Sequence, residues 1–224
     1  MSKMLQMILS RYTPNWQDHC RIWKIWSMNM EIKTDKQQLF KDNETTLKET
    51  SKDNSSKELL YMTQSQLKAA DFDKVKSAYI RGMRLTDTPC SADALYCGKD
   101  NKVYLIEFKN GVMDKWTVYN VQEKIYTSLL IYTDIADTRI SKCRENLNFI
   151  LVYNESKNSD KVESERIKSQ GDTSKRKIGK YFTEKGNSNF IAFGLEKFKN
   201  IYFENVYTYT EKEFEDKFVN VYEN

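Results

Sequence analysis

The chain has 224 residues, enough for one domain with a substantial core and too few for two comfortable ones. Hydrophobic residues make up 39% of it and aromatic residues 13%, a composition that excludes a wholly disordered protein. The net charge of +4 permits nucleic-acid binding but does not indicate it, because a basic stripe matters more than the total charge.

Cysteine use and hydropathy predict a cytoplasmic protein. The four cysteines form no CxxC pair and the chain has one histidine, so neither a zinc site nor a disulfide framework is indicated. No apolar run approaches the roughly 18–20 residues that span a bilayer, and the N-terminus lacks the apolar core of a signal peptide. We therefore expect reduced thiols and no transmembrane segment.

Residues 1–54 are predicted to form an N-terminal extension and polar linker, in part disordered, before a domain over residues 55–224. Trp16, Trp23 and Trp26 stand in a basic segment. Two interpretations remain open: a poorly ordered extension, or an amphipathic helix that packs on the domain, a protein partner or a membrane surface. Residues 35–57 are polar enough to be a linker or a solvated helix.

Two helices are expected next. Ser55 and Glu58 fit a capping box before an apolar run, which predicts that a helix begins there. Either Asp71 or Asp73 is placed to cap a second helix.

A hairpin is predicted after these helices, with strands at residues 91–97 and 102–109. A three-residue turn between them would put Asn101 in the left-handed region, which Asn tolerates. Counting outward from this turn places Asp93 directly opposite Glu107, and a slip of one residue would move Asp93 to the other face. Lys109 shares the face of Glu107, because side chains alternate along a strand.

The remaining elements alternate between helix and strand. An apolar stripe predicts a helix from Asp114 to Tyr132, and residues 147–153 predict a strand. Residues 154–180 are polar, and they predict a long helix or a mobile insertion. A short helix capped by Thr210 is expected to follow two late strands, or a strand and a turn, at residues 189–198 and 201–210. This order predicts an α/β domain in which helices flank a small mixed sheet.

Asp93 and Glu107 are predicted to share one cation. Opposed residues on neighbouring strands have Cβ atoms about 4.5–5.5 Å apart, and two converging carboxylates repel each other unless a cation lies between them. Oxygen ligands favour Mg²⁺ or Mn²⁺, which can bind a phosphate oxygen and lower the pKa of a bound water. Lys109 is placed to hold that water or to stabilise the charge that develops on the phosphorane.

These residues resemble the motif of the PD-(D/E)XK nuclease superfamily. In this chain, Asp93 is separated by thirteen residues from Glu107-Phe108-Lys109. On the next predicted helix, Gln122 and Tyr126 are similar to the QxxxY motif of RecB-type exonucleases. The resemblance covers roughly residues 55–153. It implies a restriction-endonuclease-like core of helix, three strands, helix and strand, and a divalent-metal-dependent nuclease whose expected substrate is DNA.

The resemblance also implies the roles of individual residues. The two acids would bind Mg²⁺ or Mn²⁺ together with the Phe108 carbonyl, and Lys109 would serve the attacking water. Gln122 would orient the site, and Tyr126 would support it or contact DNA. A further acid on the first helix of such cores is assigned to Glu58, although the capping box explains this residue as well or better.

Other interpretations remain open. Glu107 and Lys109 could form an ordinary ion pair at an exposed strand end, and the domain could be a catalytically inactive nuclease-fold protein that binds nucleic acid or protein. A basic run either contacts a phosphate backbone or is simply solvated, and it comprises Lys175, Arg176 and Lys177. The sequence does not separate DNA from RNA. A homodimer is one arrangement that would cut both strands.

Overall fold

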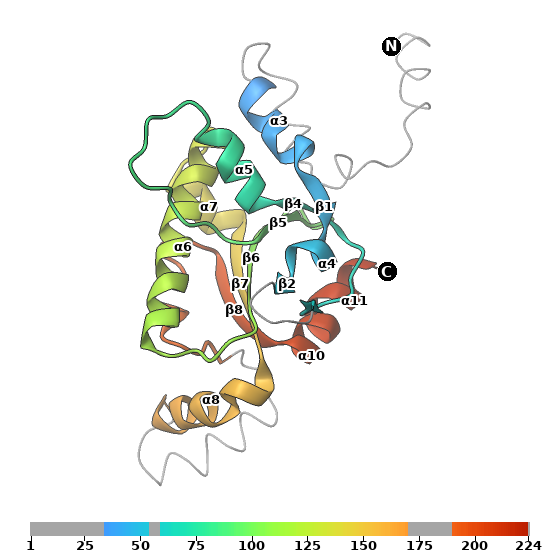
Figure 1. Cartoon of the computed structure of the whole chain (residues 1–224). Helices are drawn as coiled ribbons and strands as arrows, with labels where there is room; N and C mark the ends of the chain where they lie inside the picture. The colour runs from blue at the N-terminus through green and yellow to red at the C-terminus, as the bar shows by residue number, and fades with distance from the viewer. Residues whose placement is uncertain (1–33, 54–58, 170–189, 224) are drawn as a thin grey trace, which may run out of the picture.

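A mixed β-sheet forms the centre of the molecule, and helices flank both of its faces (Figure 1). The computed structural model describes residues 34–53, 59–169 and 190–223. Six strands lie in the order β1-β4-β5-β6-β7-β8, with the bounds Glu44–Thr46, Lys68–Asp71, Ala94–Cys97, Val103–Lys109, Leu147–Tyr153 and Asn205–Thr210. The strands from β1 to β6 pair antiparallel, whereas β7 runs parallel to both β6 and β8.

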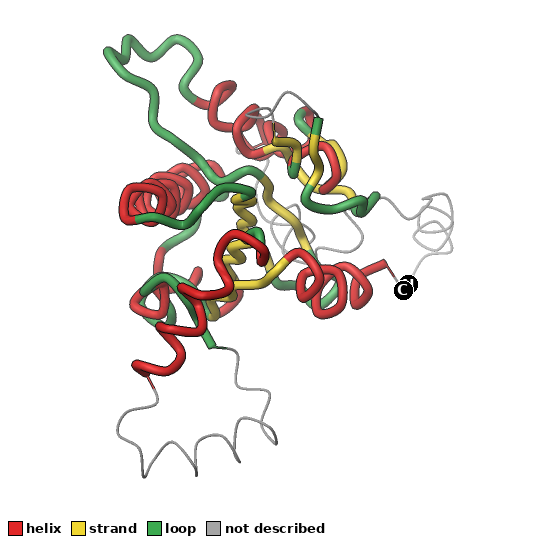
Figure 2. Tube along the Cα trace, turned by 60° about the horizontal axis from the view of Figure 1, so that its bottom comes forward, coloured by secondary structure: helices red, strands yellow, loops and turns green. Residues whose placement is uncertain are grey.

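Two groups of helices cover the sheet, so the fold is α/β. The first group packs on one face and comprises α3 (Thr34–Asp42), α5 (Phe72–Tyr79), α6 (Lys115–Ile135) and α7 (Ile140–Asn146). The second packs on the other face and comprises α4 (Leu47–Thr50), α10 (Glu211–Phe214), the π-helical turn η3 (Glu215–Val219) and α11 (Asn220–Glu223). Helix α8 (Glu155–Ser169) extends past one end of the sheet (Figures 1 and 2).

Strand β6 separates two hydrophobic cores because its side chains alternate between the two faces. Val103 and Leu105 belong to the core under α6, together with Val121, Ile125 and Leu129. The three intervening aromatic and aliphatic residues belong to the other core, where Tyr104, Ile106 and Phe108 pack with Phe214, Phe218 and Tyr222. Burial on both faces confirms that this is a central strand.

The predicted hairpin register is confirmed. The backbone N–H of Gly98 donates to the Lys102 carbonyl at 2.8 Å, and Asn101 has a φ of 64°. The strands pair so that Cys97 lies opposite Val103 and Ala94 opposite Ile106. Asp93 directly precedes β5 at a bend, where its N–H donates to the Ile106 carbonyl at 3.0 Å, one residue before Glu107.

Four other local predictions are confirmed. Asp114 accepts a hydrogen bond from the Thr117 N–H at 2.7 Å and caps α6. Asp71, rather than Asp73, caps α5 by accepting from the Lys74 N–H at 3.0 Å. Thr210 forms a capping box with Glu213 at the start of α10. Strand β7 occupies the predicted residues, 147–153.

The polar segment over residues 35–57 is not a linker in its described part. It contains α3, β1 and α4, and β1 pairs with β4 at the edge of the sheet. Phe40 and Leu47 are fully buried. A few well-spaced apolar side chains therefore anchor this segment, although its composition is polar.

The helix predicted to begin near Glu58 is wrong where the chain is described. Residues 60–61 form β3, which pairs with β2 (Lys52–Asp53), and residues 68–71 form β4. Strand β4 lies between two partner strands, and this tertiary pairing overrides the local helical preference. Glu58 itself lies outside the described residues, as do the basic run at Lys175–Lys177 and the N-terminal tryptophans.

The first of the two late segments is not a strand. Residues 195–198 form the short 3₁₀ helix η2, and the two preceding residues, Phe193 and Gly194, have φ values of 61° and 65°. Two consecutive left-handed residues turn the chain and end any extended pairing. The second segment contains β8, which agrees with the predicted alternative of one strand and one turn.

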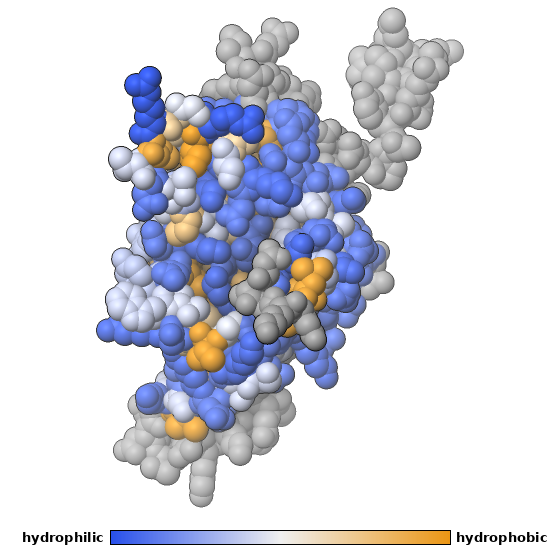
Figure 3. Space-filling view, viewed as in Figure 1, coloured by the Kyte–Doolittle hydropathy of each residue, from blue (hydrophilic) through white to orange (hydrophobic). Residues whose placement is uncertain are grey.

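Helix α6 also presents side chains to solvent. Its outward-facing hydrophobic residues include Trp116, Tyr119 and Leu130. On the face of the molecule drawn in Figure 3, hydrophobic side chains lie in separate spots among hydrophilic ones, as is ordinary for a protein surface. Within the described ranges, no helix combines the length and the hydropathy needed to cross a bilayer.

Candidate functional site

Four charged side chains meet near the carboxyl end of β6, on the face that α6 covers. Glu107 is fully buried, whereas Asp93, Lys109 and Lys124 keep 19%, 25% and 18% of their side-chain surface exposed. Two carboxylates and two ammonium groups thus lie together at a partly open position. The charges balance when all four groups are ionised.

The Lys124 ammonium lies between the two carboxylates. Its Nζ atom is 2.7 and 3.0 Å from the two oxygens of Glu107 and 3.3 Å from Oδ1 of Asp93. Lys109 approaches from the strand itself, with its Nζ 2.7 Å from Oε1 of Glu107. The two acids therefore converge on one cation position.

Backbone hydrogen bonds hold Asp93 in place. Its N–H donates to the Ile106 carbonyl and its carbonyl accepts from the Phe72 N–H, both at 3.0 Å. Its Oδ2 atom accepts from the Phe108 N–H at 2.7 Å. These contacts tie the carboxylate to the hairpin on one side and to α5 on the other.

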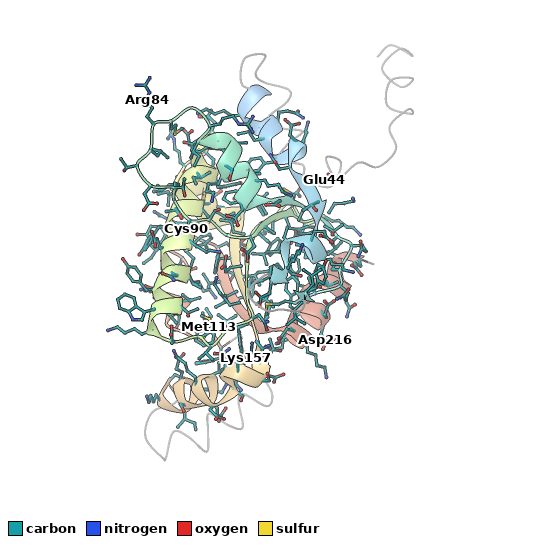
Figure 4. All side chains as sticks on the ribbon, in the orientation of Figure 1. Glu44, Arg84, Cys90, Met113, Lys157 and Asp216 are labelled. Carbon is teal, nitrogen blue, oxygen red and sulfur yellow. The ribbon has the colours of Figure 1, made fainter. Side chains whose placement is uncertain are left out.

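The segment before Asp93 is attached to α6. The Ala92 N–H donates to the Ser128 hydroxyl at 2.8 Å, and Ser128 is fully buried. One residue earlier on the helix, the Thr127 hydroxyl donates to the Cys90 carbonyl. Figure 4 shows Cys90 beside α6. Helix and hairpin are thereby joined at the level of the charged cluster.

The cluster changes the proton affinities of its members. Burial, reinforced by the negative charge of Glu107, raises the pKa of the Asp93 carboxyl to about 7. Burial opposes the charged form of Lys124, but the Glu107 and Asp93 carboxylates outweigh it and raise the pKa of this ammonium above its usual value. Lys124 therefore stays charged at neutral pH.

Gln122 and Tyr126 point elsewhere. Oε1 of Gln122 accepts from the Lys197 ammonium at 2.9 Å. The Tyr126 ring packs edge-on against Phe198 at 5.2 Å and Tyr202 at 5.8 Å. In the described part of the chain, these contacts join α6 to η2 and the residues after it. Helical geometry explains the difference, because Lys124 is turned by about 200° from each of them around the helix axis.

Lys124 is the site residue that the sequence interpretation missed. It lies three residues after Val121 and four before Ser128, both fully buried, so it belongs to the buried face of α6. The sequence signal that could have identified Lys124 is a lysine on the buried face of a helix that follows a strand with a buried acid. Asp73 on α5 was given only a capping role, yet its negative charge also raises the pKa of Lys124.

The donor set fits a hard divalent cation only in part. Asp93 and Glu107 supply carboxylate oxygens, which Mg²⁺ and Mn²⁺ prefer, and they already converge on a cation. Among the described residues, no group of three or more His, Cys, Asp or Glu side chains converges on one point. The Phe108 ring packs against Phe214 on the opposite face, so this residue could contribute only its backbone.

Comparisons with known proteins give no further guide to this site. No family model, no curated protein and no solved structure matches the chain. Its chemistry must therefore be inferred from the cluster formed by Asp93, Glu107, Lys109 and Lys124.

Proposed function

We propose that the chain is a divalent-metal-dependent nuclease of the PD-(D/E)XK type. The observation that carries this proposal is the convergence of the Asp93 and Glu107 carboxylates on one cation position, with Lys109 2.7 Å from Glu107 on the same strand face. Glu107 and Lys109 lie on β6, and Asp93 directly precedes its partner strand β5, so these three residues belong to one backbone hairpin rather than to a chance surface contact.

The order of elements around the site is compatible with a restriction-endonuclease-like core. Strands β4, β5 and β6 are antiparallel, α6 follows them, and β7 returns parallel to β6. Fold alone does not define activity. It supports the proposal because Asp93 directly precedes β5 while Glu107 and Lys109 lie on β6, as the resemblance leads us to expect.

Each site residue receives a role. Asp93 and Glu107 would hold Mg²⁺ or Mn²⁺ with the Phe108 carbonyl, and such an ion would polarise the phosphate and lower the pKa of a bound water. Lys109 positions the attacking water and faces the charge that develops on the phosphate. Gln122 and Tyr126 contact η2 and the residues after it, so we assign them a positioning role. They orient α6 and do not reach the reacting atoms.

The test is cleavage of a substrate panel by the full chain. Linear duplex, circular duplex and single-stranded DNA, together with RNA, are incubated with Mg²⁺, Mn²⁺ or EDTA. Wild type is compared with Lys109→Ala and with Lys115→Ala, which removes an exposed lysine from the first turn of α6. We expect metal-dependent cutting of DNA that Lys109→Ala abolishes and Lys115→Ala preserves. Equal cutting by all three proteins would refute the assignment, and RNA cutting alone would replace DNA as the substrate.

A second candidate function is a nuclease-fold protein that binds nucleic acid or protein without cleaving it. The position of Lys124 favours it, because the ammonium occupies the point that both carboxylates share. A charge-balanced cluster of this kind can be purely structural. This function would be supported by retarded migration of nucleic acid without cleavage in any metal, unchanged in Lys109→Ala.

A further inference from the structure

We infer that Lys124 is an internal counter-ion that competes with the divalent cation for the position between Asp93 and Glu107. In this view, metal entry requires the ammonium to withdraw, and the lysine sets how tightly the site binds metal. The inference rests on the proposed function, since it concerns the same two acids.

All four carboxylate oxygens are engaged. Lys124 Nζ contacts Oε1 and Oε2 of Glu107 at 2.7 and 3.0 Å and Oδ1 of Asp93 at 3.3 Å. The remaining oxygen, Oδ2 of Asp93, accepts from the Phe108 N–H at 2.7 Å. A cation that binds both acids must therefore take oxygens that Lys124 now holds.

The surroundings allow this exchange. Lys124 has a flexible four-carbon stem, and its 18% exposure leaves a route toward solvent. Asp73 on α5 already pairs with Lys76 at 3.3 Å, but it is half exposed and adds a further negative charge for the displaced ammonium, since its charge already raises the pKa of Lys124. The lysine can thus leave the carboxylates without losing every favourable charge interaction.

Charge balance predicts the direction of the effect. When all four groups are ionised, the two lysines neutralise the two carboxylates, and a divalent ion adds two positive charges. Without Lys124, one positive charge faces two negative ones, and the position becomes attractive to a divalent ion. Lys109 remains to hold Glu107 in either state.

The test measures Mn²⁺ binding by the full chain without substrate. Calorimetry gives the Kd, and thermal unfolding gives the Tm with and without Mn²⁺. Lys124→Met removes the charge, and Lys124→Gln removes it while keeping an amide donor, in case the first variant does not fold. Lys124→Arg keeps the charge, and Lys115→Met serves as a control on the same helix.

We expect the neutral Lys124 variants to bind Mn²⁺ about 10- to 100-fold more tightly than wild type. This factor corresponds to removing one charge-assisted hydrogen bond between a carboxylate and the competing ammonium. The Tm of the neutral variants should fall without metal and rise further on adding it, whereas Lys124→Arg and Lys115→Met should behave as wild type. Equal or weaker Mn²⁺ binding by the neutral variants overturns the competition and leaves the nuclease intact. Absence of Mn²⁺ binding in every protein overturns the metal site itself.

Discussion

The raised pKa of Asp93 makes the stability of the metal-free protein depend on pH. The folded state holds this proton up to about pH 7, whereas the unfolded chain releases it near 3.8. Between these values the folded state binds more protons, so the free energy of unfolding falls as the pH rises and levels off above about 7. A rise from 3.8 to about 7 corresponds to at most about 4 kcal/mol, at 1.36 kcal/mol for each pH unit.

Asp93→Asn removes this titration and keeps an acceptor for the Phe108 N–H. We expect its free energy of unfolding to vary less with pH than that of wild type, and to exceed the wild-type value at pH 8. Urea titrations at pH 4, 6 and 8 in EDTA measure both, and Glu123→Gln, which removes an exposed acid from α6, controls for general charge. Parallel pH profiles for wild type and Asp93→Asn would refute the reasoning, because they would show that Asp93 ionises normally.

Three further outcomes are expected. Lys109→Ala should lower the rate of metal-dependent cleavage by about 10²- to 10⁴-fold, measured as initial rates at saturating Mg²⁺, and a rate within a factor of two would exclude a role in the reaction. Phe218→Ala, in the aromatic core with Tyr96 and Tyr104, should cost about 3–5 kcal/mol of unfolding free energy in urea. Asn101→Ala should destabilise the left-handed turn by about 1–2 kcal/mol while Asn101→Gly is tolerated, and equal losses in both would indicate that the Asn side chain matters instead.

Local rules were enough to predict the hairpin and its register. Asn101 fixes the turn, the alternation of side chains fixes the faces, and together they give the observed pairs from Cys97–Val103 to Ala94–Ile106. The same is true of α6, whose start is set by Asp114 and whose apolar stripe continues to its end. In these elements, residues close together in the sequence determine the local structure.

The failures have a different physical cause. Strand β4 forms because β1 and β5 pair with it from both sides, and residues 59–71 alone show a helical pattern instead. The motif on α6 includes Gln122 and Tyr126 but not Lys124, so it does not predict this residue. Helical geometry places Lys124 on the buried face, but its partners on another strand become evident only once the chain is folded.

The two cores of the sheet become available at different times during synthesis. Strands β5 and β6, helix α6 and strand β7 are complete by Tyr153, so the core under α6 and its charged cluster can begin to form while translation continues. The opposite face of β6 must wait for β8, α10 and α11, which begin at Asn205. Until these residues leave the ribosome, no aromatic side chains from the C-terminal helices cover Tyr104, Ile106 and Phe108. The nascent chain then exposes a hydrophobic face of the sheet that a chaperone could bind.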